Sequence, residues 1–223
     1  MNNLMFDGME YLIRYPANYT EGKRYPVVLF LHGAGTRGDD ITILKNNSFM
    51  KIIPERYEEY SFILVAPHCK HGTWFDHFET STRFTKSIAA AAYTDPARLY
   101  LVGNSMGGYG TWQLAMSMPE YFAAILPICG GGMYWNAARL VNVPVWAFHG
   151  ECDNVVHVDE SKRMVEAING KGGNAKLTLY PDTKHDCWTV TYQNKAVFEW
   201  LFAQRNQNAK ALVDGFSNNS IYG

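Results

Sequence analysis

The sequence predicts an α/β protein built on a mostly parallel central sheet with helices on both faces. Two observations support this fold class. Six short apolar runs are mostly continuous rather than alternating, which is typical of strands that are covered on both faces. Segments of helical length lie between most of these runs, and strand alternating with helix is the pattern of βαβ units with right-handed crossovers.

The strand and helix candidates follow one another along the chain. Strands are predicted at the apolar runs, which cover 25–31, 61–66, 98–102, 123–128, 143–148 and 175–180. Helices are predicted at 45–57, 80–93, 106–117, 159–169 and 190–204. An extra edge strand is predicted over 10–15. A short helix over 135–140 is the candidate for a lid above the sheet, so we expect a minimal lid.

Length and composition favour one folded unit. A chain of 223 residues, 47% of them hydrophobic, can bury about 70% of the surface that it exposes when extended. No linker divides the chain, so we predict a single domain over residues 1–205 and a polar C-terminal tail over 206–223. The 20 Lys and Arg residues balance 21 Asp and Glu residues without a basic run, which argues against a nucleic-acid partner.

The N-terminus and the cysteines bear on location. The first ten residues contain Asp7 and Glu10 but neither a basic segment nor a long apolar stretch, so we predict neither a secretory signal nor a membrane span. A cytoplasmic location is the default expectation. The four cysteines are too few and too widely spread for a disulfide scaffold, and we expect free thiols.

The motif Gly103-Asn-Ser-Met-Gly107 carries the clearest chemical signal. It lies between a predicted buried strand and a predicted helix. A serine at such a strand-to-helix turn adopts a strained conformation that lifts its hydroxyl above the sheet, and the flanking glycines leave room for the tight bend. We therefore predict Ser105 as a nucleophile.

A serine hydroxyl needs a base and an acid, and the chain supplies both in the order Ser, Asp, His. Asp153 follows the strand that ends near residue 148, and His185 follows the next strand. We predict His185 as general base and acid, and Asp153 as the carboxylate that orients it. Other carboxylates flank these positions and leave a swap of the acid open: Glu151, Asp159, Asp182 and Asp186.

An oxyanion hole is predicted at the end of the first central strand, where His32-Gly33-Ala34 follows the apolar run. Backbone N–H groups aimed at a developing oxyanion contribute on the order of 3 kcal/mol each. One donor is expected from the residue after the nucleophile, Met106, and the second from Ala34.

The motifs together resemble the α/β-hydrolase superfamily. The segments that carry the resemblance are His32–Asp40, Asp95–Gly110, the Asp153 loop and His185–Trp188. Within the superfamily they are most similar to small esterases related to dienelactone hydrolases, phospholipase/carboxylesterases and feruloyl or acetyl-xylan esterases. The resemblance covers about residues 10–204.

This resemblance implies an α/β-hydrolase fold and a serine carboxylesterase that works without a cofactor. The matching positions are Ser105, Asp153 and His185, with Ala34 and Met106 as oxyanion amides. Dienelactone hydrolases proper have cysteine as the nucleophile at this strand-to-helix turn, so Ser105 points away from their reaction. Polysaccharide esterases are often secreted, whereas no signal is predicted for this chain.

Large side chains near the predicted strand ends are candidates for the walls of a substrate cleft. They are Trp74, Phe75, Met133, Tyr134, Trp135 and Trp188, and His32 of the His-Gly loop is added as a substrate-binding candidate. Aromatic walls suit an apolar or aromatic acyl group, although simple packing under loops would also explain them. We predict hydrolysis of short-chain or hydroxycinnamoyl esters, including those of sugars, through an acyl-enzyme.

Other activities stay open. A thioesterase, a lysophospholipase or an acyltransferase would use the same three residues. A peptidase is less favoured, because the related oligopeptidases usually carry an extra domain, and a non-catalytic binding protein is less favoured because the catalytic parts are complete. The small-molecule ester is the predicted partner, with no membrane partner and no indication of oligomeric state.

Two further groups of residues bear on metal binding and on disulfide formation. His68, Cys69 and His71 suggest a metal, but no second ligand pair follows at zinc spacing, so no metal is predicted. Cys152 and Cys187 adjoin the predicted acid and base, and a bridge between them is an alternative to free thiols.

Overall fold

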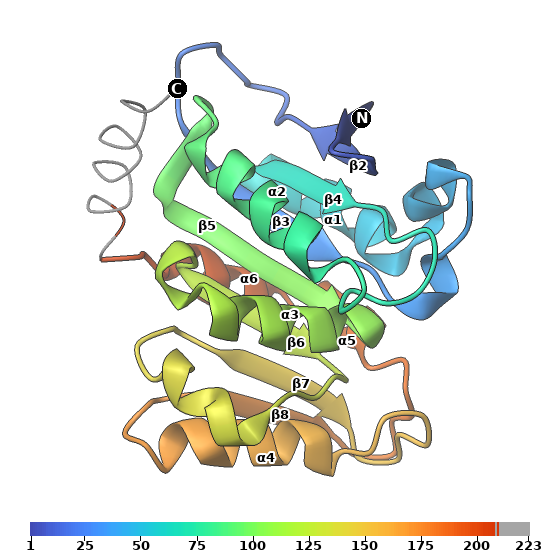
Figure 1. Cartoon of the computed structure of the whole chain (residues 1–223), viewed down its shortest axis with the longest axis vertical. Coiled ribbons are helices and arrows are strands. Elements are labelled where there is room, and N and C mark those ends of the chain that lie inside the picture. Colours follow the sequence, from blue (N-terminus) through green and yellow to red (C-terminus); the bar gives the residue numbers. More distant parts are fainter. Residues whose placement is uncertain (208, 210–223) are drawn as a thin grey trace.

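A mixed sheet forms the centre of the structure (Figure 1), which confirms the predicted α/β class. The computed structural model describes residues 1–207 and 209, with the side chains of all of these except 54–58. Most of the predicted tail, 206–223, therefore lies outside the described residues. The strands are β1 (Asn2–Phe6), β2 (Met9–Arg14), β3 (Tyr25–Leu31), β4 (Ile63–Pro67), β5 (Thr94–Asn104), β6 (Ala124–Ile128), β7 (Trp146–Gly150) and β8 (Lys176–Tyr180).

The strand order in the sheet is β1-β2-β4-β3-β5-β6-β7-β8. The β1–β2 and β2–β4 pairs are antiparallel, and every pair from β4 to β8 is parallel. Between the strands lie η1 (Ala34–Thr36), η2 (Ile41–Asn46), α1 (Ser48–Glu59), α2 (Phe78–Ala90), α3 (Met106–Ser117), η3 (Pro119–Tyr121), η4 (Tyr134–Leu140) and α4 (Asp159–Asn169), followed after β8 by α5 (Trp188–Gln193) and α6 (Lys195–Ala203).

Helices cover both faces of the sheet. In Figure 1, α2, α3 and α4 cross the near face, while α1, α5 and α6 lie behind it. The core accordingly divides into two clusters, and β3 contributes to both: Val27 and Leu29 pack on one face, Val28 and Phe30 on the other. A strand buried on both faces needs apolar residues at every position, which explains the continuous run in the sequence.

A hairpin at the N-terminus differs from the sequence prediction. The strand expected at the edge over 10–15 is β2, which lies inside the sheet because β1 pairs with its outer side. The β1 residues are mostly exposed and have no apolar pattern that would predict a strand. The sequence feature that indicates this hairpin is Asp7-Gly8, because Asp-Gly is typical of two-residue hairpin turns. Both residues have positive φ, 48° and 80°.

Two predicted helices are interrupted at asparagines. The helix expected over 45–57 begins only at Ser48, because Asn47 Oδ1 accepts the amide of Phe49 at 2.9 Å. The helix expected over 190–204 is two helices, α5 and α6, and Asn194 caps the second by accepting the amide of Ala196 at 3.1 Å. Asparagine offers the backbone an alternative partner, which favours a cap over helix continuation. By contrast, α3 and α4 have the predicted bounds.

The element predicted as a lid is part of the helical layer. It is η4, and its Ala137 and Leu140 are buried in the core cluster that also contains side chains of α3 and α4. The expectation of a short helix over 135–140 is confirmed, but its role as a cover over the sheet is not. In the described part of the chain, no helix combines the length and the apolar character required to cross a bilayer.

Candidate active site

Three predicted residues meet at the carboxyl edge of the parallel strands. Ser105 follows β5, Asp153 follows β7 and His185 follows β8. The Oγ of Ser105 lies 2.8 Å from Nε2 of His185, and Nδ1 of His185 lies 2.7 Å from Oδ2 of Asp153. An imidazole in this position can accept the hydroxyl proton through one nitrogen while the carboxylate holds the other. The arrangement is therefore suited to nucleophilic catalysis.

The turn at Ser105 is strained, and the two motif glycines make it possible. Ser105 has φ 56° and ψ −120°, a conformation that non-glycine residues rarely adopt. A Cβ atom on Gly103 would lie 2.3 Å from the carbonyl oxygen of Gly107, and one on Gly107 would lie 1.9 Å from that of Leu31. Side chains at either position would force the turn apart, so this backbone path requires the glycine spacing of the motif.

Asp153 is held in its ionised form. Its side chain is fully buried, and Oδ1 accepts the amides of Val155 and Val156, each at 2.9 Å. Burial alone would raise the pKa of Asp153, but the hydrogen bond with His185 and the two backbone amides outweigh it, and the pKa lies below its ordinary value. A charged carboxylate behind the imidazole favours proton uptake by His185 from the hydroxyl.

The other carboxylates considered for the acid are engaged elsewhere or point into solvent. Asp159 lies 3.4 Å from Nδ1 of His157 and forms an ion pair with Lys162 at the start of α4. Asp186 accepts the amide and the hydroxyl of Thr189 at the start of α5. Glu151 and Asp182 are exposed. Among the described residues, Asp153 is the carboxylate that contacts His185.

The two amides predicted for the oxyanion hole each belong to the first residue of a helix. Ala34 begins η1 and Met106 begins α3, and amides of a first turn have no partner within their helix. The amide of Ser105 itself is occupied, since it donates to the carbonyl oxygen of Ile128 at 2.9 Å. First-turn amides of this kind can donate hydrogen bonds to a developing negative charge.

A cavity of about 430 Å³ opens in front of Ser105. The residues that line it are Gly33, Ala34, Gly35, Thr36, Asn46, Asn47, Ser48, Asn104, Ser105, Val155, His185 and Trp188. The ring of Trp188 stands perpendicular to that of His185 with centroids 5.2 Å apart. The polar segment 46–48 was not predicted as part of the site, because the sequence pattern placed it in a helix and gave no signal of its exposure to the cavity.

The structure brings only Trp188 of the predicted substrate-binding residues to this cavity. The side chains of His32 and Trp74 are buried, 0% and 3% exposed, so the expectation that they contact substrate is corrected. Phe75 and Trp135 are exposed, but neither lines the cavity. Residue type alone cannot tell whether an aromatic side chain lines the cavity, is buried in the protein or is exposed elsewhere, because this depends on the path of the loops.

His32 instead supports the loop that leads from β3 to Ala34. Its Nε2 accepts the amide of Cys69 at 3.0 Å, so the proton lies on Nδ1, which donates to the carbonyl oxygen of Gly33 at 2.8 Å. The indole of Trp74 donates to the carbonyl oxygen of His32 at 2.9 Å. Burial lowers the pKa of His32 from 6.5 to about 4.

Replacement of His32 by glutamine should reduce the acid sensitivity of folding. Between pH 6.5 and 4 the unfolded chain protonates His32 while the folded chain does not, so stability falls as the pH falls. We expect H32Q to have a lower free energy of unfolding than the wild type at pH 7. The difference between the two free energies should shrink by about 3 kcal/mol at pH 4. Urea unfolding at both pH values measures this, with the exposed His71 changed to glutamine as control. A gap that stays constant with pH would contradict the buried neutral imidazole.

The cysteines offer no separate site. All four are free, with Cys152 exposed and Cys187 buried against Cys129, so the bridge between Cys152 and Cys187 does not form. Among the described residues, Cys129, Asp153 and His185 are close enough to suggest a metal, with ligand atoms within 4.8 Å of one another. Asp153 and His185 are already hydrogen-bonded together, and burial raises the pKa of the Cys129 thiol well above its usual value. The Cys129 thiol itself faces that of Cys187, so all three side chains already have partners within the protein, and we assign no metal to them.

The side chains of His68, Cys69 and His71 do not converge on a common point where a metal could bind. The Sγ of Cys69 donates to the carbonyl oxygen of His71 at 3.2 Å, and Nε2 of His71 lies 3.2 Å from Asp39. The Nε2 of His68 faces the carbonyl oxygen of Thr36 at 3.1 Å. The three side chains are thus turned to different partners.

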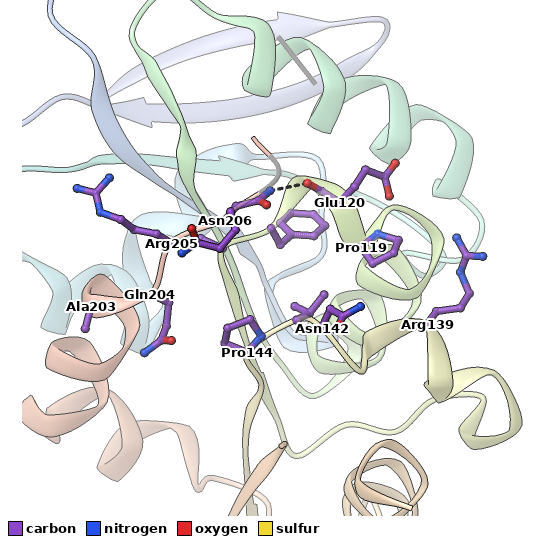
Figure 2. Close-up of a pocket in the computed structure, with 13 residues that line it drawn as sticks. Pro119, Glu120, Arg139, Asn142, Pro144, Ala203, Gln204, Arg205 and Asn206 are labelled. Atoms are coloured by element: carbon purple, nitrogen blue, oxygen red, sulfur yellow. Dashed lines mark hydrogen bonds between the residues drawn. The ribbon is translucent and has the colours of Figure 1, made fainter. Parts of the chain in front are cut away.

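A larger cavity, about 720 Å³, lies at the opposite, amino ends of β6 and β7 (Figure 2). Its described lining residues include Glu120, Arg139 and Arg205 but no serine, threonine, cysteine or histidine. Figure 2 shows Asn206 bonded to the carbonyl oxygen of Glu120 across its rim, while the guanidinium groups of Arg139 and Arg205 point apart. The described residues that line this cavity therefore include neither a side-chain nucleophile nor a histidine base like those found at the carboxyl edge of the strands.

Comparisons with known proteins find a matching family and several relatives. A model of the dienelactone hydrolase family matches residues 17–213. Dipeptidyl-peptidase 5 of Porphyromonas gingivalis is 21% identical over 242 residues, which cover 84% of this chain and 34% of that protein. Probable feruloyl esterase C of Aspergillus clavatus is 26% identical over 130 residues, covering 56% of this chain and 47% of that protein. The chain spans about a third of the length of the dipeptidyl-peptidases.

Solved structures include esterases. A thermostable esterase superposes with a TM-score of 0.82 at 32% identity, covering 88% of this chain and 59% of that one. A ferulic acid esterase superposes with a TM-score of 0.69 at 15% identity, covering 90% and 96%. The latter likeness concerns the fold, which is that of α/β-hydrolases.

Proposed function

Because the chain belongs to the dienelactone hydrolase family, we propose that it is a serine carboxylesterase with Ser105, His185 and Asp153 as its catalytic triad. The observation that carries the proposal is the unbroken series of hydrogen bonds, 2.8 Å from Ser105 to His185 and 2.7 Å from His185 to Asp153. The esterases among the similar structures and relatives support it.

The reaction proceeds in two halves. Oγ of Ser105 attacks the ester carbonyl while Nε2 of His185 takes its proton, and the resulting oxyanion accepts bonds from the amides of Ala34 and Met106. The protonated His185 then donates to the departing alcohol, which leaves an acyl group on Ser105. In the second half, His185 takes a proton from water as the water attacks the acyl carbonyl. The protonated His185 then returns the proton to Oγ of Ser105, and the carboxylic acid leaves. Asp153 stays ionised throughout and keeps the imidazole oriented.

The cavity favours a small ester. Its volume of about 430 Å³ is near the lower end of small-molecule sites, which span about 300–1,000 Å³. Trp188 and Val155 supply apolar surface, and segment 46–48 supplies polar groups. We assign short-chain or hydroxycinnamoyl esters as substrates, including those of sugars.

Trp188 should decide between acyl groups. We expect W188A to lower kcat/KM for a feruloyl ester about fivefold, because an aromatic pair contributes roughly 1 kcal/mol beyond its buried area. Acetyl ester turnover should change little, since a methyl group does not reach an aromatic wall. Steady-state kinetics with acetyl, butyryl, octanoyl and feruloyl esters measure both effects.

The control is W135A, because Trp135 is 72% exposed and lies outside the cavity. It should leave the preference unchanged. Equal losses on acetyl and feruloyl esters in W188A would mean that Trp188 only supports His185, and the aromatic acyl assignment would be abandoned.

A peptidase is the second candidate, because dipeptidyl-peptidases are among the relatives. An enzyme that selects a free amino terminus needs an anionic group to hold it. Among the described residues that line the cavity, none carries a carboxylate. We therefore expect esters to be cleaved and dipeptidyl p-nitroanilides to be left intact; rapid release of p-nitroaniline would favour the peptidase.

A further inference from the structure

A second histidine contacts the acid of the triad. His149 lies in β7, four residues before Asp153, and its side chain is fully buried. Its Nε2 lies 3.2 Å from Oδ2 of Asp153 and 2.9 Å from the carbonyl oxygen of Val156. The same Oδ2 is the atom that His185 binds. Asp153 is thus flanked by two imidazoles.

The position of the proton on His149 follows from its neighbours. Nε2 faces two acceptors, the Asp153 carboxylate and the Val156 carbonyl, so this nitrogen must carry a proton and donate. Burial lowers the pKa of His149, which favours the neutral ring with Nδ1 unprotonated. Nδ1 lies 2.7 Å from Oγ of Ser161, whose single proton is shared between this nitrogen and the carbonyl oxygen of Gly130.

Ser161 connects this histidine to the nucleophile side of the site. Its hydroxyl also lies 3.0 Å from the carbonyl oxygen of Gly130, in the turn after β6. Gly130 packs directly on α3, since a Cβ added to it would meet the backbone of Gly108 at 2.5 Å. The acid loop and the helix that follows Ser105 are therefore joined through Asp153, His149, Ser161 and Gly130.

We propose that His149 is a positioning residue: its Nε2–H bonds the carbonyl oxygen of Val156 and, at the longer distance of 3.2 Å, also faces Oδ2 of Asp153, which fixes the carboxylate in the orientation that His185 needs. The proposal rests on the function proposed above. With the Val155 and Val156 amides on Oδ1 and two histidines on Oδ2, the carboxylate is held on both oxygens. A displacement of about 1 Å in such a group can cost about 100-fold in rate.

The test compares phenylalanine and glutamine at position 149. Phenylalanine keeps the size and shape of a ring but donates nothing, whereas the amide nitrogen of glutamine can replace Nε2–H. We expect H149F to lower kcat for p-nitrophenyl acetate by about 10- to 100-fold with little change in KM, and H149Q to recover most of it. The control is H157A, since His157 lies in the same loop with its side chain 75% exposed.

A double-mutant cycle separates positioning from general support of the fold. In the D153N background, H149F should slow fluorophosphonate labelling no further, because the group through which it acts is already changed. An equal loss in both backgrounds, or a folded H149F with wild-type kcat, would overturn the proposal.

If H149F does not fold, S161A takes its place in the same cycle, because it removes the hydroxyl that holds the ring. Its loss of kcat should again vanish in D153N, and a loss that persists there would overturn the proposal. Activity that survives in S105A would instead refute the proposed function itself, so the two failures are distinguishable.

Discussion

Alanine at position 105 is expected to abolish both turnover of p-nitrophenyl acetate and labelling by a fluorophosphonate, with kcat lower by about 10⁶-fold. The reason is that no acyl-enzyme can form without the hydroxyl that His185 contacts at 2.8 Å. The substitution removes one oxygen atom at a residue with positive φ, so circular dichroism and the melting temperature should be checked alongside the kinetics.

The matched control for this prediction is S117A. Ser117 ends the same helix that begins after Ser105, and it is exposed. Its replacement should leave turnover and labelling at wild-type levels. Labelling that persists in a folded S105A would place the nucleophile elsewhere and remove the basis of the proposed mechanism.

Loss of His185 should be nearly as severe. Without the imidazole, the Ser105 hydroxyl keeps its proton and the leaving alcohol receives none, so H185A should lower kcat by about 10⁶-fold. KM should change far less, because His185 contributes only one part of the cavity wall. Steady-state kinetics at saturating ester separate the two parameters.

Combining the two substitutions provides an additional check. Residues that act as a unit show non-additive effects, so S105A/H185A should be no slower than either single variant. H157A serves as the control histidine, since its side chain is 75% exposed and faces solvent. A folded H185A with kcat within tenfold of wild type would contradict the role of His185 as the base.

The fold was largely predictable because its signals are local. Continuous apolar runs such as β3 are required by burial on both faces, and the bounds of α3 and α4 followed from the sequence directly. The helix breaks at Asn47 and Asn194 were missed because hydrophobic periodicity continues across a cap. The β1 strand was missed because its residues are exposed and only its turn is distinctive.

The site was predictable to the extent that chemistry dictates spacing. A nucleophile elbow needs glycine two positions on either side of Ser105, and the order of strands then places Asp153 and His185 at the same edge. Their catalytic roles stay predictions that the variants above test. The cavity walls were less accessible to sequence reasoning, because whether Trp74 or Trp188 faces a substrate depends on loop paths that residue type does not encode.

The same limit applies to His149. A histidine four residues before an acid gives no sign in the sequence of whether it packs, binds substrate or supports the acid. Only the distances of its two ring nitrogens to Asp153, Val156 and Ser161 reveal the arrangement.

Mass spectrometry of the intact protein after exposure to a fluorophosphonate, followed by peptide mapping, examines the central claim most directly. One adduct should form on the wild-type chain and map to residue 105, and H185A should remain unmodified over the same time. An adduct on another side chain, such as the exposed thiol of Cys152, or equal modification of H185A, would contradict a serine activated by His185.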